Sequence, residues 1–212
     1  MRAGRRLGIA ALLALGLGVV AIAVSLGVSW TMYNTARIPG RSMEPAYRKN
    51  SVVFSEKIDG AAVRRGDVVL FDAPERLSHG MSMQRVVAVG GDHLVCCARG
   101  KLTLNGERLD EPYVAHGIAD GLGVRYDVTV PSRRLFVLGD NRRDSMDSRM
   151  YLARQDGTVP LSAVRFRVLD DNSAPVAWFA TGLAGLAAVA TGLALGTAWF
   201  VVRRRPAAVA AS

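Results

Sequence analysis

Histidine, lysine and cysteine are scarce in this chain, and each scarcity limits its chemistry. The 212 residues include three histidines and two cysteines, Cys96 and Cys97, which are adjacent. This pattern contains no zinc spacing and no disulfide framework, so we expect no metal and no cofactor. The Cα atoms of neighbours lie only about 3.8 Å apart, which would strain a bridge between them. We therefore expect two buried thiols on opposite faces of a strand, with a vicinal redox pair or an intermolecular link as the alternatives.

Two long stretches have no charge. Residues 7–30 are apolar or small, interrupted only by Ser25 and Ser29, and residues 176–202 carry paired aromatics near both ends. A helix rising about 1.5 Å per residue crosses a hydrocarbon core of about 30 Å within either stretch. We expect two transmembrane helices. The first stretch has a rival interpretation as a cleaved signal peptide, but it exceeds the roughly 7–15 apolar residues of such a segment and no clear small-x-small site follows.

The flanks of these stretches are rich in arginine. Three arginines lie within residues 1–6 and three within residues 203–212. Short positively charged flanks remain in the cytoplasm, so we expect both termini to be cytoplasmic and residues 31–175 to be extracytoplasmic. The chain is then a multi-pass protein of the cell membrane, in contact with its lipid.

The net charge follows from this topology. The chain has 27 Lys and Arg against 18 Asp and Glu, but six of the arginines flank the apolar stretches, which leaves 21 against 18. A basic chain would otherwise suggest nucleic-acid binding. We therefore expect no nucleic-acid partner.

Residues 31–175 form one ordinary domain by length, and their pattern is that of β-structure. No ten-residue helical pattern appears there, and Asn105-Gly106 is a strong hairpin signal. The looser stretch at about 91–130 contains this hairpin and could form a smaller inserted lobe. The expected strands are residues 51–56, 67–71, 83–89, 101–104, 107–109, 135–138 and 164–169.

A candidate nucleophile follows the first apolar stretch by about a dozen residues. The tetrapeptide Ser42-Met43-Glu44-Pro45 would lie where the chain leaves the membrane. A serine beside a bilayer is well placed to cut chains threaded through it. Taken alone, however, Ser42 is equally well explained as a turn residue ahead of Pro45, which restricts Glu44 to extended geometry.

A second chemical cluster follows the predicted strand at 135–138. Residues 139–149 hold six charges, two serines and a single apolar side chain. Such a segment is ordinarily a solvated loop. Its three aspartates and three arginines could also neutralise one another in a closed network and fix the loop beside a site. The charged residues are Asp140, Arg142, Arg143, Asp144, Asp147 and Arg149.

These segments together resemble the bacterial type I signal peptidases, the membrane-bound serine proteases of family S26 that remove signal peptides from exported proteins. The resemblance covers most of residues 1–175, and the order, spacing and adjacent membrane span make it specific. It implies a mainly β catalytic domain, a barrel or sandwich with a small inserted hairpin lobe, flanked by two transmembrane helices. The blocks that carry it are residues 38–45, 65–71, 84–92, 105–106 with 111–113, and 139–149.

The resemblance implies a role for each site residue. Ser42 would be the nucleophile, and its N–H would help form the oxyanion hole. Gly40 falls where some members have a serine that adds a second oxyanion donor. Family substrates carry a small-x-small pattern and enter a groove as an added strand. Ser145 would orient the base, Asp147 and Arg149 would be the supporting charge pair, and Ile38, Met43 and Met83 would line the substrate pocket.

Gln84 departs from the family pattern. The family has a general-base lysine here, which works because burial favours the neutral amine that accepts the serine proton. A glutamine amide accepts a hydrogen bond but cannot take up that proton. Gln84 is therefore not a competent base.

No lysine or histidine lies within the segments that match the family motifs. The three lysines, Lys49, Lys57 and Lys101, lie elsewhere. His79 is a candidate, since related signal peptidases use histidine, but it is five positions before Gln84. An odd separation puts two strand residues on opposite faces, although a loop at Ser78-His79-Gly80 could turn the imidazole inward. His93 and His116 fall in the looser lobe and are weaker candidates.

Three functions remain open. The first is a serine endopeptidase that removes signal peptides at the outer face of the cytoplasmic membrane, with preprotein signal peptides and the export machinery as partners. The second, motivated by Gln84, is a catalytically impaired protein that binds signal peptides or partner peptidases. The third is a processing peptidase with one dedicated substrate.

Overall fold

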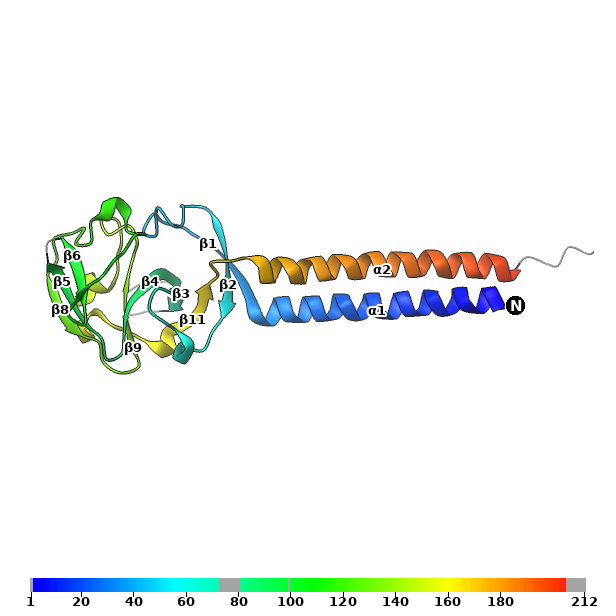
Figure 1. Ribbon diagram of the computed structural model, residues 1–212, viewed down its shortest axis with the longest axis horizontal. Helices are drawn as coiled ribbons and strands as arrows, with labels where there is room; N and C mark the ends of the chain where they lie inside the picture. The colour runs from blue at the N-terminus through cyan, green and yellow to red at the C-terminus, as the bar shows by residue number, and fades with distance from the viewer. Residues whose placement is uncertain (1, 73–80, 99, 205–212) are drawn as a thin grey trace, which may run out of the picture. The chain divides into compact units, whose positions relative to one another are not determined.

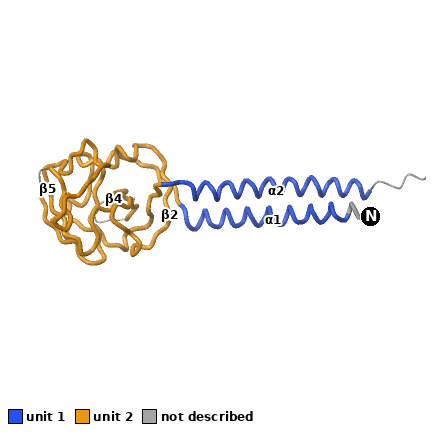
Figure 2. The backbone as a smooth tube through the Cα atoms, in the orientation of Figure 1, with its two compact units in different colours: residues 1–33, 171–212 blue, residues 34–170 orange. Residues whose placement is uncertain are grey.

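The computed structural model describes residues 2–72, 81–98 and 100–204 (Figure 1). The chain divides into two compact units (Figure 2). One consists of residues 1–33 and 171–212, and the other of residues 34–170.

The first unit is a pair of long helices, α1 (Arg2–Met32) and α2 (Ser173–Arg204), that lie side by side (Figure 1). Both are long and apolar enough to cross a membrane. Glycine permits the close approach: a Cβ added at Gly18 would lie 2.7 Å from the Gly185 carbonyl oxygen. The Ser25 hydroxyl also donates a hydrogen bond to the Trp178 carbonyl at 2.7 Å. Small residues and interhelical hydrogen bonds are what hold helices together in lipid.

The second unit contains two antiparallel sheets. Seven strands pair in the order β1-β2-β11-β3-β4-β9-β10, and four in the order β7-β6-β5-β8. The strands of the larger sheet are β1 (Tyr33–Arg37), β2 (Val52–Lys57), β3 (Val68–Asp72), β4 (Met81–Val89), β9 (Arg134–Leu138), β10 (Val159–Pro160) and β11 (Val164–Val168). Those of the smaller sheet are β5 (His93–Ala98), β6 (Lys101–Leu104), β7 (Glu107–Arg108) and β8 (Tyr126–Thr129).

The fold class predicted from the sequence, mainly β with two flanking helices, is confirmed. Each of the seven predicted strands is present with its ends shifted by at most two residues. Asn105 and Gly106 both have positive φ, as the two-residue turn between β6 and β7 requires. The prediction missed β1, β5, β8 and β10. Helical structure in the described part of residues 34–170 is limited to short 3₁₀ turns, at Gly60–Ala62, Ala115–Gly117, Ser148–Tyr151, Gln155–Gly157 and Leu161–Ala163.

One hydrophobic cluster joins the two sheets. Phe136 of β9 is fully buried and packs with Leu94, Leu102 and Val128 of the smaller sheet. Its ring centroid lies 5.2 Å from that of Tyr126 in β8. The smaller sheet therefore shares a core with the larger one.

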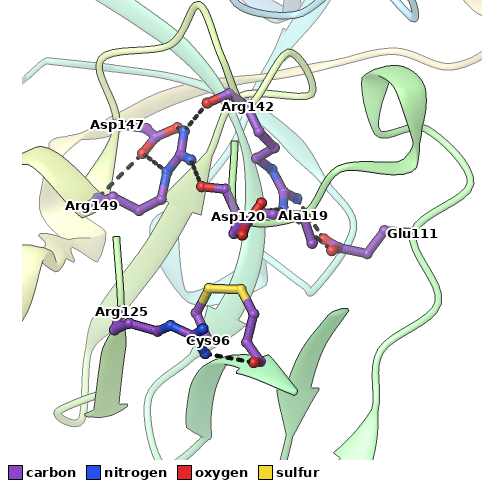
Figure 3. The surroundings of a disulfide bond; sticks show 9 residues. Cys96, Glu111, Ala119, Asp120, Arg125, Arg142, Asp147 and Arg149 are labelled. Carbon is purple, nitrogen blue, oxygen red and sulfur yellow. Dashed lines mark hydrogen bonds and ion pairs between the residues drawn. A yellow bond between two sulfur atoms is a disulfide. The ribbon is translucent and has the colours of Figure 1, made fainter. Parts of the chain in front are cut away.

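The expectation of two free thiols is wrong. Cys96 and Cys97 form a vicinal disulfide at the end of β5 (Figure 3). The expectation assumed strict alternation of side chains along a strand. The register between β5 and β6 shifts between Cys96 and Ala98, and such an irregularity breaks the alternation. Both cysteines consequently lie in the same buried cluster.

We predict that Phe136→Ala lowers the free energy of unfolding by about 3–5 kcal/mol, because it opens a cavity where the sheets meet. Thermal unfolding of the full chain in detergent, followed by tryptophan fluorescence and circular dichroism, measures the effect. Val52→Ala is the control, since Val52 is 55% exposed and should change stability little. Equal effects of the two changes would contradict the shared core.

Candidate active site

A cleft of about 490 Å³ lies at the end of β1 and beside the first half of β4. Its wall brings Ser42 together with Met83 and Gln84 of β4, which lie about forty residues further along the sequence. The other lining residues are Ala36, Arg37, Ile38, Pro39, Gly40, Leu70, Met81, Ser82 and Met146.

The loop that carries Ser42 is fixed by backbone hydrogen bonds. The Ile38 N–H donates to the Ser51 carbonyl at 3.0 Å, and the Asn50 N–H donates to the Ile38 carbonyl at 2.8 Å. The carbonyl of Ser42 accepts a hydrogen bond from the Asn141 N–H at 2.9 Å. Ser42 is half-buried, and its hydroxyl makes no hydrogen bond to another residue of the described ranges. The hydroxyl is thus available on a rigid loop.

The first half of β4 has a free edge. On one side, Met83 pairs with Leu70 and Gln84 with Val69, both in β3. On the other side, β9 begins to pair only at Arg85, opposite Leu138. Within the described residues, no strand pairs with Met81–Gln84 on that side. Unpaired backbone groups along a cleft can accept an extended peptide as an additional strand.

Gln84 and Ser145 are both buried, and each leaves a polar atom without a partner among the described residues. The Gln84 Nε2 donates to the Met146 carbonyl at 2.6 Å. Gln84 Oε1 and Ser145 Oγ are buried and, within the described residues, have no hydrogen-bond partner. A buried polar atom without a hydrogen bond costs free energy, and in a folded protein it calls for a specific explanation such as a functional site.

The described lining of the cleft contains no side chain that could act as a base. Arg37 is its one ionisable residue and always carries a proton at neutral pH. His93 lies outside this lining, on β5, where its Nε2 is 2.5 Å from Asp127 Oδ1. His79 lies outside the described residues.

Asp147 and Arg149 form a fully buried, bidentate ion pair (Figure 3). Arg149 Nε and Nη2 each lie 2.8 Å from an Asp147 oxygen. The same carboxylate accepts a hydrogen bond from the Gly139 N–H at 3.1 Å, and Arg149 donates to the Arg142 carbonyl at 2.8 Å. The pair thereby ties the end of β9 to the loop that carries Ser145.

The expected closed network within residues 139–149 is partly wrong. Arg142 pairs outside the segment, with Glu111 at 2.6 Å (Figure 3), and Asp140 pairs with Arg85 of β4 at 2.7 Å. Arg143 and Asp144 are exposed. Burial is the largest single effect on the pKa of the Arg85 guanidinium and lowers it, but the hydrogen bonds to Asp140 and the charge of Asp140, with smaller effects of Tyr113 and Tyr47, together raise it above its usual value. The loop is therefore fixed to two other parts of the domain rather than closed on itself.

Gly139 lies where three segments meet. A Cβ added there would lie 2.3 Å from Ser145 Oγ and 2.5 Å from the Ser42 carbonyl oxygen. Backbone and side-chain atoms this close leave room for a hydrogen atom only. This contact fixes Ser145 beside the backbone of Ser42.

The predicted substrate-pocket residues are not all on the cleft. Ile38 and Met83 line it. Met43 is fully buried in the core with Val68 and Leu70 and does not line the cleft. Sequence reasoning missed Met146, which is 62% exposed at the cleft. Met146 is the single apolar residue in a charged loop, and this contrast could have identified it from the sequence.

A model of the family described as "Signal peptidase, peptidase S26" matches residues 10–168. That range is well over half of the chain. The chain therefore belongs to the signal peptidase family, peptidase S26.

Several curated relatives show the same similarity. A probable signal peptidase I-2 of Synechocystis is 32% identical over 139 residues, and the alignment covers 63% of this chain and 62% of the relative. A signal peptidase I of Bacillus licheniformis is 30% identical over 147 residues, covering 65% and 77%. A signal peptidase I of Mycobacterium tuberculosis is 33% identical over 177 residues, covering 60% of each. The chain thus spans about six-tenths of the Synechocystis and Mycobacterium relatives.

The search of solved structures found a crystal structure of a signal peptidase I from Enterococcus faecalis. It has 28% sequence identity and a TM-score of 0.39 and covers 50% of this chain and 96% of that one.

We predict that Arg149→Met lowers the free energy of unfolding by about 3–5 kcal/mol, because it leaves the Asp147 carboxylate buried without a counter-charge. Thermal unfolding in detergent measures the loss. Arg41→Met is the matched control, because its ion pair with Glu44 is exposed to solvent and should contribute little to stability. A small, equal loss in both variants would mean that the buried pair contributes no more than a surface pair.

We predict that Gly139→Ala destabilises the domain by about 1–3 kcal/mol, since the methyl group must push apart the Ser42 backbone and Ser145. Gly40→Ala is the control within the same cleft, because a Cβ there meets nothing within 4 Å. Melting temperatures of the two variants in detergent give the comparison. An unchanged melting temperature for Gly139→Ala would contradict the tight contact.

Proposed function

We propose that the chain is a membrane-anchored serine endopeptidase that removes signal peptides from exported preproteins at the outer face of the cytoplasmic membrane. The observation that carries the proposal is the cleft that brings Ser42 to the free edge of β4. Membership of the signal peptidase family supports it. In this proposal both termini are cytoplasmic, and residues 31–175 face outward with the signal peptide and the export machinery.

The cleft suits an extended substrate. A peptide added along Met81–Gln84 would form main-chain hydrogen bonds with the free strand edge, and its alternate side chains would point into the cleft. Ile38, Met83 and Leu70 give the wall an apolar lining. A shallow apolar pocket of this kind suits the small side chains that precede a signal-peptide cleavage point.

In this mechanism the Ser42 Oγ adds to the scissile carbonyl carbon. The carbonyl oxygen gains negative charge, which backbone N–H groups such as that of Ser42 would stabilise. The C–N bond then breaks, and the amine leaves with a proton, so that the signal peptide remains as an ester on Ser42. Water hydrolyses the ester and restores the hydroxyl. The described lining offers no acceptor for the serine proton, so turnover would be slow.

Gln84 supports a second candidate function. The residue is buried, its Nε2 is held by the Met146 carbonyl, and no competent base replaces it among the described lining residues. General-base catalysis is worth roughly 10²–10⁴ in rate. A protein that keeps the groove and lacks the base would bind signal peptides, or partner peptidases, without appreciable cleavage.

We predict that Gln84→Lys raises the cleavage rate by roughly 10²–10⁴, because a buried lysine supplies the missing base. The rate should increase with pH as that lysine loses its proton. The assay incubates the purified full chain in detergent with a preprotein and follows cleavage on gels. Gln155→Lys, the same change at an exposed position, is the matched control and should leave the rate unchanged.

The serine is tested in the same assay. Ser42→Ala should abolish cleavage both alone and combined with Gln84→Lys. Cleavage by the unaltered chain that disappears in Ser42→Ala supports the peptidase, and binding without cleavage supports the second candidate. Failure of Gln84→Lys to increase the rate would contradict the assigned base position, and loss of activity in His79→Ala would identify a different base.

A further inference from the structure

A second cleft, of about 660 Å³, opens beside the loop that carries Ser42. It shares no lining residue with the first cleft, and its residues alternate along the same loop with those of the first. Its lining is Arg41, Glu44, Pro45, Arg48, Lys49, Ala115, His116 and Asn141.

The walls of this second cleft are fixed to the backbone of Ser42. One wall is the loop itself, and the other is formed by Ala115 and His116. Asp140 and Asn141 connect the two: the Ala115 N–H donates to the Asp140 carbonyl at 3.0 Å, and the Asn141 N–H donates to the Ser42 carbonyl at 2.9 Å. Two of its lining residues, Arg41 and Asn141, therefore adjoin the backbone of Ser42.

The second cleft has an excess of positive charge. Its lining has three permanent cations, Arg41, Arg48 and Lys49, and one carboxylate, Glu44. Arg41 Nε lies 3.1 Å from Glu44 Oε2, and this hydrogen bond, together with one from the Lys49 N–H, lowers the pKa of Glu44. Glu44 therefore neutralises one cation. Arg48 and Lys49 are exposed and form no ion pair with any residue that the structure describes.

We infer that the second cleft binds the part of the substrate that follows the scissile bond and selects acidic side chains in its first few residues. This inference rests on the proposed function. A peptide laid along the free edge of β4 reaches Ser42 at its scissile bond and must continue beyond it. At about 3.3–3.6 Å per extended residue, the next two or three residues extend about 7–11 Å beyond Ser42, and the second cleft is the neighbouring cavity on the same loop. Carboxylates there would meet uncompensated cations.

Binding to the full-length Ser42→Ala protein tests the inference without requiring turnover. Labelled peptides would span a small-x-small cleavage site and carry two Glu, two Gln or two Lys at the second and third positions after it. We expect the Glu peptide to bind roughly five- to tenfold more tightly than the Lys peptide at low salt, with a smaller ratio at high salt. Fluorescence anisotropy in zwitterionic detergent micelles measures the dissociation constants.

Charge reversal then tests the position of the site. Arg48→Glu with Lys49→Glu should remove or invert the preference. Lys57→Glu with Arg108→Glu changes the net charge equally at exposed positions outside both clefts and should preserve it. If both double variants lose the preference equally, the effect comes from the overall charge and the inference is overturned.

Three further results of the binding experiment can be told apart. Equal binding of the Glu and Lys peptides would overturn the inference alone, because the peptide-binding groove would remain supported. Absence of binding by every peptide would overturn the proposed function together with the inference. Loss of the preference when an anionic phospholipid is added to the micelles would assign the cleft to lipid headgroups and would likewise overturn it.

Discussion

The close contact at Gly139 is the constraint on which the candidate site depends. The end of β9, the loop of Ser42 and the loop of Ser145 meet there, with room for no side chain. Two residues after Gly139, the Asn141 N–H donates a hydrogen bond to the Ser42 carbonyl. Segments about a hundred residues apart in the sequence are thereby held against each other, and the proposed nucleophilic chemistry depends on such positioning.

Buried ion pairs then determine how the loop at residues 139–149 is oriented at this contact. Removing a carboxylate from water costs several kcal/mol, and only a well-placed cation with further hydrogen bonds offsets the cost. Asp147, Glu111 and Asp140 each have a bidentate arginine partner, and the three arginines bind three different parts of the domain. Arg142 reaches Glu111 in the segment between β7 and β8, Arg149 remains in its own loop, and Arg85 belongs to β4. The loop at 139–149 is therefore oriented by ion pairs that would be poorly satisfied in any other arrangement.

The sequence was informative where local chemistry decides the structure. Short runs rich in Val, Leu and Phe predicted β3, β4, β9 and β11, and Asn105-Gly106 predicted its hairpin, because strand and turn preferences act over a few residues. β5 and β8 were missed because their pairing is decided by a shared core at Phe136, which no local pattern reveals. The disulfide was mispredicted since the irregularity after Cys96 depends on the partner strand.

The site could be predicted in part for the same reason. The motifs around Ser42 and residues 139–149 identified the segments, but not how they are joined. Residues 84–92 and 111–113 belong to the recognised motifs, but the sequence does not reveal that Arg85 and Glu111 form ion pairs, because an ion pair between distant segments is a property of the fold. The position of Met43 in the core, rather than on the cleft, likewise follows from how the loop packs against β3.

Binding and proton transfer are separable in this architecture. The free edge of β4, the apolar wall and the cationic second cleft involve backbone groups and side chains other than that of Gln84. The base of a serine nucleophile, by contrast, depends on a single side chain. At position 84 the side chain is an amide whose oxygen has no hydrogen-bond partner among the described residues. A change at this one residue would leave the groove intact and alter the rate by orders of magnitude. The two proposed functions therefore differ in one respect, which is whether a proton acceptor reaches Ser42.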